Sequence, residues 1–279
     1  MAKKVSLINM KGRVGKSTLT VNLAWFFGLQ RSKRVLVVDL DPQFNASQYL
    51  LGPTAYAGIL RENRPTVWDI FEQNTRTPHS QGQGLDVRAA VYNRAAPPGG
   101  GRIDLIPSRL DLAFTLKTPY QQKENELCKG LAAVEENYDL ILIDCAPTES
   151  MLTTAAYLSS DYLLVPVKPE YLSTIGLPLL VNSMRYFNEA YPDRALRLAG
   201  VVFNATTEYA PEEMLAKAEV RQIAAHNHWY VFDAEVTSSR SYAKGARLGV
   251  SIFNTPHARI SQIRRFSAFA LEFAGRIGL

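Results

Sequence analysis

The sequence predicts an α/β fold in which a mostly parallel, twisted sheet carries helices on both faces. Short β-rich runs alternate with helical segments almost throughout the chain, which is the pattern of parallel strands joined by crossover helices. The central runs VLVVD, LILID and LLVPV are apolar on both alternating faces, as fully buried strands are. Two of these runs end on aspartates, so a ligand site is expected at the carboxyl ends of the strands.

The same patterns give the order of the elements. Strands are expected at residues 5–8, 34–39, 103–106, 140–144, 162–166 and 198–204, with two weaker candidates at 230–232 and 250–253. Helices are expected at residues 18–30, 121–137, 173–189, 211–226 and 256–277. Residues 74–102 are rich in proline and glycine and predict surface loops around a short element. A single domain over residues 1–279 is the simplest organisation.

Composition narrows the class of protein. With 279 residues, 47% of them apolar, the chain can bury a full core. A net charge of +5 permits a polyanionic partner such as DNA without requiring one. Cys128 and Cys145 have no disulfide or metal-site spacing and are expected to be buried apolar residues. The N-terminal apolar run is too short for a signal peptide and no stretch has membrane-spanning length, so a cytoplasmic location is expected.

Residues 9–18 (NMKGRVGKST) have the character of a phosphate-binding loop between a strand and a helix. In this interpretation Lys16 reaches the β- and γ-phosphates of a nucleotide, Ser17 binds Mg²⁺, and Gly15 allows close backbone approach. Met10 occupies the place of the first glycine in the strict motif. The nucleotide contacts expected from the loop are Lys11, Gly12, Arg13, Val14, Gly15, Lys16, Ser17 and Thr18.

The second lysine of the loop, Lys11, makes the segment similar to the deviant Walker A loop (KGGVGKT/S) of the ParA/MinD class of ATPases. In that class two subunits enclose two ATP molecules face to face. The resemblance implies a P-loop ATPase that forms a homodimer on ATP, with Lys11 crossing to the partner's nucleotide as a catalytic residue beside Lys16. A solvated surface lysine is the alternative for Lys11.

Two further motifs follow in the order that this class has. The string DxDPQxNAS contains Asp39 and Asp41 after a buried strand, and DLILIDCAP ends a strand on Asp144. The resemblance implies that Asp41 positions the attacking water, while Asp39 and Asp144 act near Mg²⁺ together with Ser17. An Asp-Pro turn in which Asp41 only caps the backbone is the alternative for that residue.

Asn204 ends the strand expected at residues 198–204. Its amide could donate to and accept from an adenine edge, and relatives of this class often carry an asparagine there. A plain turn asparagine is the alternative.

Arg13 departs from the class, which has the second glycine of KGG at this position. A side chain is tolerated there if the backbone keeps a negative φ, so nucleotide binding is expected to survive. The guanidinium could clash with the partner's loop, repel the incoming Lys11, or add a cation to the phosphates. Dimerisation and hydrolysis are therefore the steps that Arg13 could alter.

The segment RSYAKGAR places Arg240, Lys244 and Arg247 in what reads as a loop. ParA-type proteins carry residues there that bind DNA without sequence preference, and Arg264 and Arg265 could extend the patch. A solvated loop is the alternative. The last helix is amphipathic and could lie on a membrane as the tail of MinD does, although such a stripe more often packs against the sheet.

The resemblance as a whole implies a ParA-like ATPase that binds ATP and Mg²⁺, dimerises, holds nucleoid DNA and positions or segregates a cargo. The cargo would be a plasmid, a chromosome or a protein assembly. Hydrolysis would be slow and stimulated by a ParB-like or other cargo-bound adaptor. A MinD-like membrane-associated ATPase that regulates division or positioning is the alternative. The nitrogenase iron protein also resembles this loop, but it needs paired cluster-binding cysteines that are lacking here.

Overall fold

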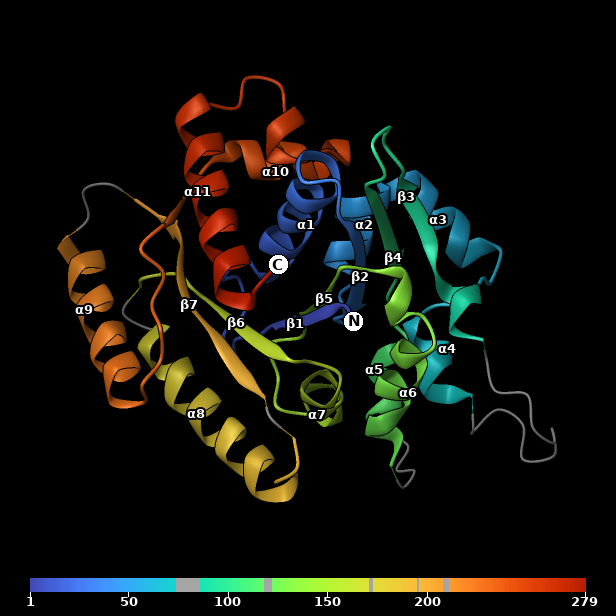
Figure 1. Cartoon of the computed structure of the whole chain (residues 1–279), viewed down its shortest axis with the longest axis horizontal. Helices are drawn as coiled ribbons and strands as arrows, with labels where there is room; N and C mark the ends of the chain where they lie inside the picture. The colour runs from blue at the N-terminus through green and yellow to red at the C-terminus, as the bar shows by residue number, and fades with distance from the viewer. Residues whose placement is uncertain (74–85, 118–121, 171–172, 195, 208–210) are drawn as a thin grey trace.

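The computed structural model describes residues 1–73, 86–117, 122–170, 173–194, 196–207 and 211–279. Within these residues one sheet of eight strands runs through the molecule in the order β3-β4-β2-β5-β1-β6-β7-β8 (Figure 1). All neighbouring strands pair in parallel except β3 and β4, which are antiparallel. The strands are β1 (Lys3–Leu7), β2 (Arg34–Leu40), β3 (Tyr92–Ala95), β4 (Arg102–Ile106), β5 (Leu140–Cys145), β6 (Tyr162–Val167), β7 (Arg197–Thr206) and β8 (Val236–Thr237).

Helices cover both faces of this sheet (Figure 1). One side carries α1 (Lys16–Trp25), α2 (Asn45–Leu51), α10 (Arg240–Leu248) and α11 (Ile260–Ile277). The other side carries α4 (Val67–Glu72), α6 (Glu126–Ala132), α7 (Met151–Leu158), α8 (Ser173–Ala190) and α9 (Pro211–His226). The remaining helices α3 (Pro53–Arg61) and α5 (Leu112–Thr115) lie toward the β3 side of the sheet (Figure 1).

The two cores are built from alternate residues of the same strands. In β5, Leu140 and Leu142 pack into one core, whereas Ile141 and Ile143 pack into the other. All four side chains are fully buried. The expected fold class, an α/β domain with a mostly parallel sheet and helices on both faces, is therefore confirmed, and its physical cause is the two-sided apolar character of the central strands.

The six main strands lie where the sequence predicts them, and no strand end differs by more than two residues. The two weaker candidates were wrong: residues 230–232 contribute only an isolated bridge between Val201 and Val231, and residues 250–253 overlap a 3₁₀ turn at Ile252–Asn254. The expected loop segment 74–102 lies partly outside the described residues. Its described part holds a 3₁₀ turn (Val87–Ala90) and the edge strand β3.

The expected helices differ mainly at their ends. Residues 211–226 form α9 as expected. The helix expected at 18–30 ends at Trp25 and continues as a π-turn, Phe26–Gln30. The helix expected at 121–137 is broken in its described part, where 3₁₀ turns flank α6. The last helix begins at Ile260 rather than at 256.

The two cysteines differ in burial. Cys145 is buried, and burial raises the pKa of its thiol to about 12, whereas Cys128 is only partly buried. Among the helices that the structure describes, none is both long and apolar enough to span a bilayer.

The π-turn after α1 packs its backbone directly on β4, and Gly28 makes this possible. A Cβ at Gly28 would lie 2.4 Å from Cγ1 of Ile103 and 3.4 Å from the backbone oxygen of Arg102. Because both neighbours belong to a strand inside the sheet, neither can move away easily.

We therefore expect Gly28→Ala to lower the free energy of unfolding by about 1–3 kcal/mol through overpacking. Urea unfolding followed by circular dichroism measures the loss. Gly58→Ala in α3 is the matched control, because no atom lies within 4 Å of its added Cβ, and it should gain about 0.5–1 kcal/mol from helix propensity. Equal effects of the two substitutions would contradict the packing argument.

Candidate functional site

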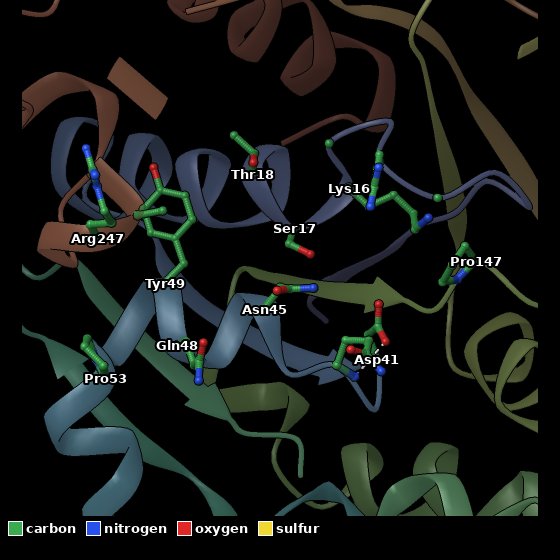
Figure 2. Close-up of a pocket in the computed structure, with 15 residues that line it drawn as sticks. Lys16, Ser17, Thr18, Asp41, Asn45, Gln48, Tyr49, Pro53, Pro147 and Arg247 are labelled. Carbon is green, nitrogen blue, oxygen red and sulfur yellow. Dashed lines mark hydrogen bonds between the residues drawn. The ribbon is translucent and has the colours of Figure 1, made fainter. Parts of the chain in front are cut away.

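The carboxyl ends of β1, β2 and β5 open onto a cavity of about 620 Å³. Figure 2 shows Lys16, Asp41 and Pro147 at one end of this cavity and Arg247 and Tyr49 at the other. Its walls come from the loop before α1, from α2 and from the C-terminal part of α10. The site predicted at the carboxyl edge of the sheet is thus a real concavity.

Two asparagines hold the loop of residues 9–15 in place. Asn9, at the end of β1, donates from Nδ2 to the carbonyl of Pro166 (2.8 Å), and its Oδ1 accepts from the backbone N–H of Lys11 (2.8 Å). Asn204, in β7, donates from Nδ2 to the carbonyl of Val14 (2.7 Å). The loop is thereby fixed to two neighbouring strands before any ligand arrives. The sequence interpretation missed this role of Asn9.

Gly15 makes the contact with Asn204 possible. Its φ is +87°, and a Cβ there would lie 2.2 Å from Nδ2 of Asn204, so only glycine fits. The amide of Asn204 holds the phosphate loop through one of its hydrogens. The residue lies inside β7 and not in a plain turn, and the contact with an adenine stays a prediction.

Lys16 points back into its own loop. Its ammonium donates to the carbonyls of Asn9 (3.1 Å) and Lys11 (3.2 Å), and the residue is 6% exposed. Burial lowers the pKa of Lys16, while the nearby Asp144 carboxylate opposes that shift. An ammonium held only by neutral carbonyls in a buried place would gain from an anionic partner.

Asp39 lies behind the cavity and does not line it. Its carboxylate is fully buried and accepts from the N–H of Asp41 (3.1 Å), the N–H of Ser47 (2.8 Å) and the hydroxyl of Ser47 (2.6 Å). Burial raises the pKa of Asp39 to about 7, against these hydrogen bonds. This carboxylate fastens the start of α2 through Ser47, and its expected support of the metal stays a prediction.

Asp144 pairs in register with Asp39 on the adjacent strand. It is fully buried, its Oδ1 accepts a long hydrogen bond from Thr20 (3.4 Å), and its Oδ2 has no partner among the described residues. Burial, and then the Asp39 carboxylate, raise the pKa of Asp144 well above its usual range.

An orphaned carboxylate oxygen near Ser17 suits a hydrated divalent cation, which prefers oxygen ligands. Among the described residues no group of three or more His, Cys, Asp and Glu side chains could hold a metal. A magnesium ion that takes most of its ligands from water and phosphate oxygens needs no such group. Ser17, which lines the cavity, and Asp144 therefore fit the predicted ion.

Asp41 lines the cavity and is 8% exposed. Its Oδ1 accepts from the N–H of Gln43 (2.9 Å), which is the Asx-type turn that the sequence left as an alternative. The second carboxylate oxygen still belongs to a side chain on the cavity wall, and the water-positioning role of Asp41 stays a prediction.

Lys11 is tied to its own chain and does not line the cavity. Its ammonium lies 3.3 Å from Oε2 of Glu170, which also pairs with Lys168. Hydrogen bonding from Lys168 is the main reason that the pKa of Glu170 is lowered, and Lys11 adds to the effect. The Lys11 side chain is 24% exposed, so it is not simply solvated.

Arg13 has a φ of +62°, which contradicts the expectation of a negative φ. Its side chain lines the main cavity and also a smaller one of about 260 Å³ beside it. No ion pair or hydrogen bond joins its guanidinium to a described residue. The glycine of the class is thus replaced at a position whose backbone favours glycine.

The smaller cavity continues from Thr18 to Asn204 and to the stretch that follows β8. The sequence interpretation assigned nothing to this stretch. Its signal was a run of small polar residues, TSSRS, directly before the predicted basic segment. Thr237, Ser238, Ser239 and Tyr242 line the wall there.

The basic segment was expected to be a loop, and this was wrong: residues Arg240–Leu248 form α10. Ser239 caps it by accepting from the N–H of Ser241, and Gly249 ends it at φ +65°. Arg240 and Arg247 are exposed, and Lys244 donates to the carbonyl of Pro256 (3.3 Å). Arg264 and Arg265, on α11, are exposed as well.

The apolar stripe of α11 packs into the core. Phe266, Phe269, Phe273 and Ile277 are at most 1% exposed. Most of the stripe that a membrane-binding tail would need is therefore covered, as the sequence favoured, whereas Ile260 and Leu271 of the same helix are 68% and 47% exposed.

The sequence is similar to a family model and to proteins of other organisms over most of its length. A family model described as an AAA domain matches residues 2–197. An uncharacterized protein of Pseudomonas putida is 31% identical over 90% of this chain and 86% of its own length. The chromosome-partitioning ATPase Soj of Treponema pallidum is 28% identical over 100% of this chain and 99% of its own length.

Solved structures share the fold. An ATP complex of an McdA variant from Cyanothece has a TM-score of 0.76 at 18% identity and covers 100% of this chain and 97% of that chain. A plasmid partition protein of Borrelia burgdorferi has a TM-score of 0.70 at 19% identity, covering 99% of each chain.

The positive φ of Arg13 generates a first prediction for this site. Arg13→Gly should raise the free energy of unfolding by about 0.5–1 kcal/mol, because relief of the left-handed strain exceeds the entropy cost of glycine. Arg13→Ala is the matched control: it keeps the Cβ and should bring no gain. Urea unfolding without nucleotide measures both. If Arg13→Ala stabilised the protein as much as Arg13→Gly, loss of the guanidinium charge would explain the gain, and the strain argument would be contradicted.

The buried carboxylate pair generates a second prediction. Because the folded pKa values of Asp39 and Asp144 are raised above the unfolded value of about 4, the folded state binds more protons near neutral pH. Stability without metal should therefore fall, by about 2 kcal/mol, as the pH rises from about 5 to about 8. Unfolding midpoints in EDTA measure this fall, which Asp144→Asn should reduce. A wild-type stability that rises over this window would refute the assignment.

Proposed function

The chain belongs to the ParA/MinD class of ATPases, and on that premise we propose that it binds ATP with Mg²⁺ at residues 9–18 and hydrolyses it as part of a pairing switch. The observation that carries the proposal is the convergence of three groups at the carboxyl edge of the sheet. Lys16 has only neutral partners, Asp41 faces the cavity, and Asp144 has an oxygen without a partner in the described part of the chain.

Binding would exchange one set of partners for another. The phosphates would take the Lys16 ammonium from the carbonyls of Asn9 and Lys11, and the loop N–H groups and the start of α1 would receive the remaining charge. Magnesium would be held through Ser17 and Asp144, and it supplies positive charge that neutralises the phosphate oxygens.

Hydrolysis then needs an oriented water. We assign this to Asp41, the one carboxylate among the residues on the cavity wall. The water oxygen bonds to the γ-phosphorus, the bond from that phosphorus to the β–γ bridging oxygen breaks, and ADP leaves while the water's proton passes to solvent or phosphate. Lys16 stabilises the charge that develops on the leaving oxygen.

Pairing would depend on Lys11. In the single chain its ammonium is bound to Glu170, so crossing to a partner's nucleotide requires that this ion pair be given up. A half-exposed ion pair contributes little stability, whereas a triphosphate is a far stronger anionic partner. Two subunits would then enclose two ATP molecules, as the class does.

The paired form would present α10 to DNA. Arg240 and Lys244 are four residues apart, so they share one face of the helix. Contacts from such cations to phosphates are independent of sequence and sensitive to salt. A ParB-like or other adaptor on the cargo would stimulate hydrolysis and release the nucleoid, which fits a cytoplasmic, nucleoid-associated partition ATPase.

Light scattering with a non-hydrolysable ATP analogue tests the pairing. The wild type should change from one subunit to two and should then co-sediment with DNA. Lys11→Ala should bind the analogue but weaken pairing at least about tenfold, because the trans charge is lost. Lys16→Ala, which should fail to bind the analogue, is the control for the nucleotide step.

Two outcomes would count against this function. A wild type that binds the analogue and stays a single subunit would reject the switch. Nucleotide-dependent binding to anionic vesicles, abolished by charged substitutions at the exposed Ile260 and Leu271 of α11, would favour the MinD-like alternative instead.

A further inference from the structure

Helix α10 turns one narrow face toward the nucleotide cavities. Ala246 and Arg247 follow Ala243 by three and four residues, so all three lie on the same side of the helix. Ala243 lines the smaller cavity, Ala246 lines both, and Arg247 lines the larger one. Arg247 was expected to bind DNA, yet its side chain borders the space that the loop of residues 12–18 borders from the other side.

The rotation of α10 about its axis is fixed by Gly245, on the opposite side. A Cβ at Gly245 would lie 2.6 Å from the hydroxyl of Thr255, 2.7 Å from the carbonyl of Val250 and 3.2 Å from the hydroxyl of Tyr49. Tyr49 in turn accepts a hydrogen bond from Asn22 of α1 (3.0 Å). The helix is therefore held firmly against the helix that follows the phosphate loop.

The charge around Arg247 is unbalanced. Among the described residues none forms an ion pair or a hydrogen bond with its guanidinium. The carboxylate on the cavity wall, Asp41, lies at the other end (Figure 2). A planar cation at the edge of a cavity, without a carboxylate beside it, is suited to a phosphate or to the face of an aromatic ring.

The position of Arg247 decides between these two. The phosphates would occupy the end with Lys16, and the cavity runs from there past Thr18 toward Arg247 (Figure 2). The smaller cavity joins at Thr18 and Ala246. The base and ribose of a bound nucleotide would thus lie nearest α10.

We propose that Arg247 contacts the nucleoside end of the bound nucleotide within the same chain, through its planar guanidinium, and is a nucleotide-positioning residue rather than a DNA contact. The proposal rests on the nucleotide binding proposed above. It leaves Arg240 and Lys244 as the cations of α10 for DNA, and it places nucleotide and DNA at neighbouring points of one helix.

Calorimetric titration of ATP and of ADP, both with Mg²⁺, tests this assignment. Arg247→Ala should weaken both nucleotides by the same factor, about five- to tenfold, because a contact with the nucleoside does not depend on the number of phosphates. Arg247→Lys, which keeps the charge but not the planar group, should remain weakened. Arg240→Ala is the matched control, since this exposed arginine of the same helix does not line the cavity, and it should bind both nucleotides like the wild type.

Several results would overturn the proposal. Unchanged affinities in Arg247→Ala would do so, and so would a loss confined to ATP, which would mark a phosphate contact. An equal loss in Arg240→Ala, or full recovery in Arg247→Lys, would mark a general charge effect. If the wild type bound neither nucleotide, the proposed function itself would be rejected as well. The wild-type titration is done first, so this outcome is distinguished from a failure of the Arg247 assignment.

Discussion

Two carboxylates, Asp39 and Asp144, lie side by side on adjacent strands in the dry interior of the sheet, and the site is arranged around this unfavourable pair. Like charges at such a place raise each other's pKa. Asp39 is compensated from within the fold, because Ser47 and the backbone of Asp41 donate to it. Asp144 keeps an oxygen without a partner among the described residues. That difference makes the first carboxylate structural and leaves the second available to a cation.

The charged groups of the site are held by their own chain, and in the proposed switch a nucleotide would replace those contacts. Lys16 is held by two carbonyls and Lys11 by Glu170. Asn9 and Asn204 fix the loop itself to β6 and β7, so the backbone needs little ordering when phosphates arrive. A preformed loop reduces the entropy cost of binding. The side chains of Lys16 and Lys11 are the groups that would move. Each would exchange its present partner, the loop carbonyls or Glu170, for a phosphate group.

The sequence predicted what depends on apolar pattern and on motif spacing. The central strands, the phosphate loop and the aspartates Asp41 and Asp144 fall where expected, because burial on two faces and helix-terminus geometry are local in sequence. It did not predict α2, α3, α4, α5, α7 or α10. These are short helices, and the polar and small residues of α2 and α10 resemble loops. The roles of Asn9 and Asn204 depend on strands that are distant along the chain, and the positive φ of Arg13 depends on the turn as a whole.

The most direct test of this account is the calorimetric comparison of ATP binding in Mg²⁺ and in EDTA, for the wild type and for Asp144→Asn. If the orphaned oxygen of Asp144 awaits a cation, Mg²⁺ should tighten ATP binding by the wild type at least about tenfold. The variant should lose that gain while it keeps the affinity measured in EDTA. Equal wild-type affinities in the two buffers, or a full Mg²⁺ gain in the variant, would contradict the account.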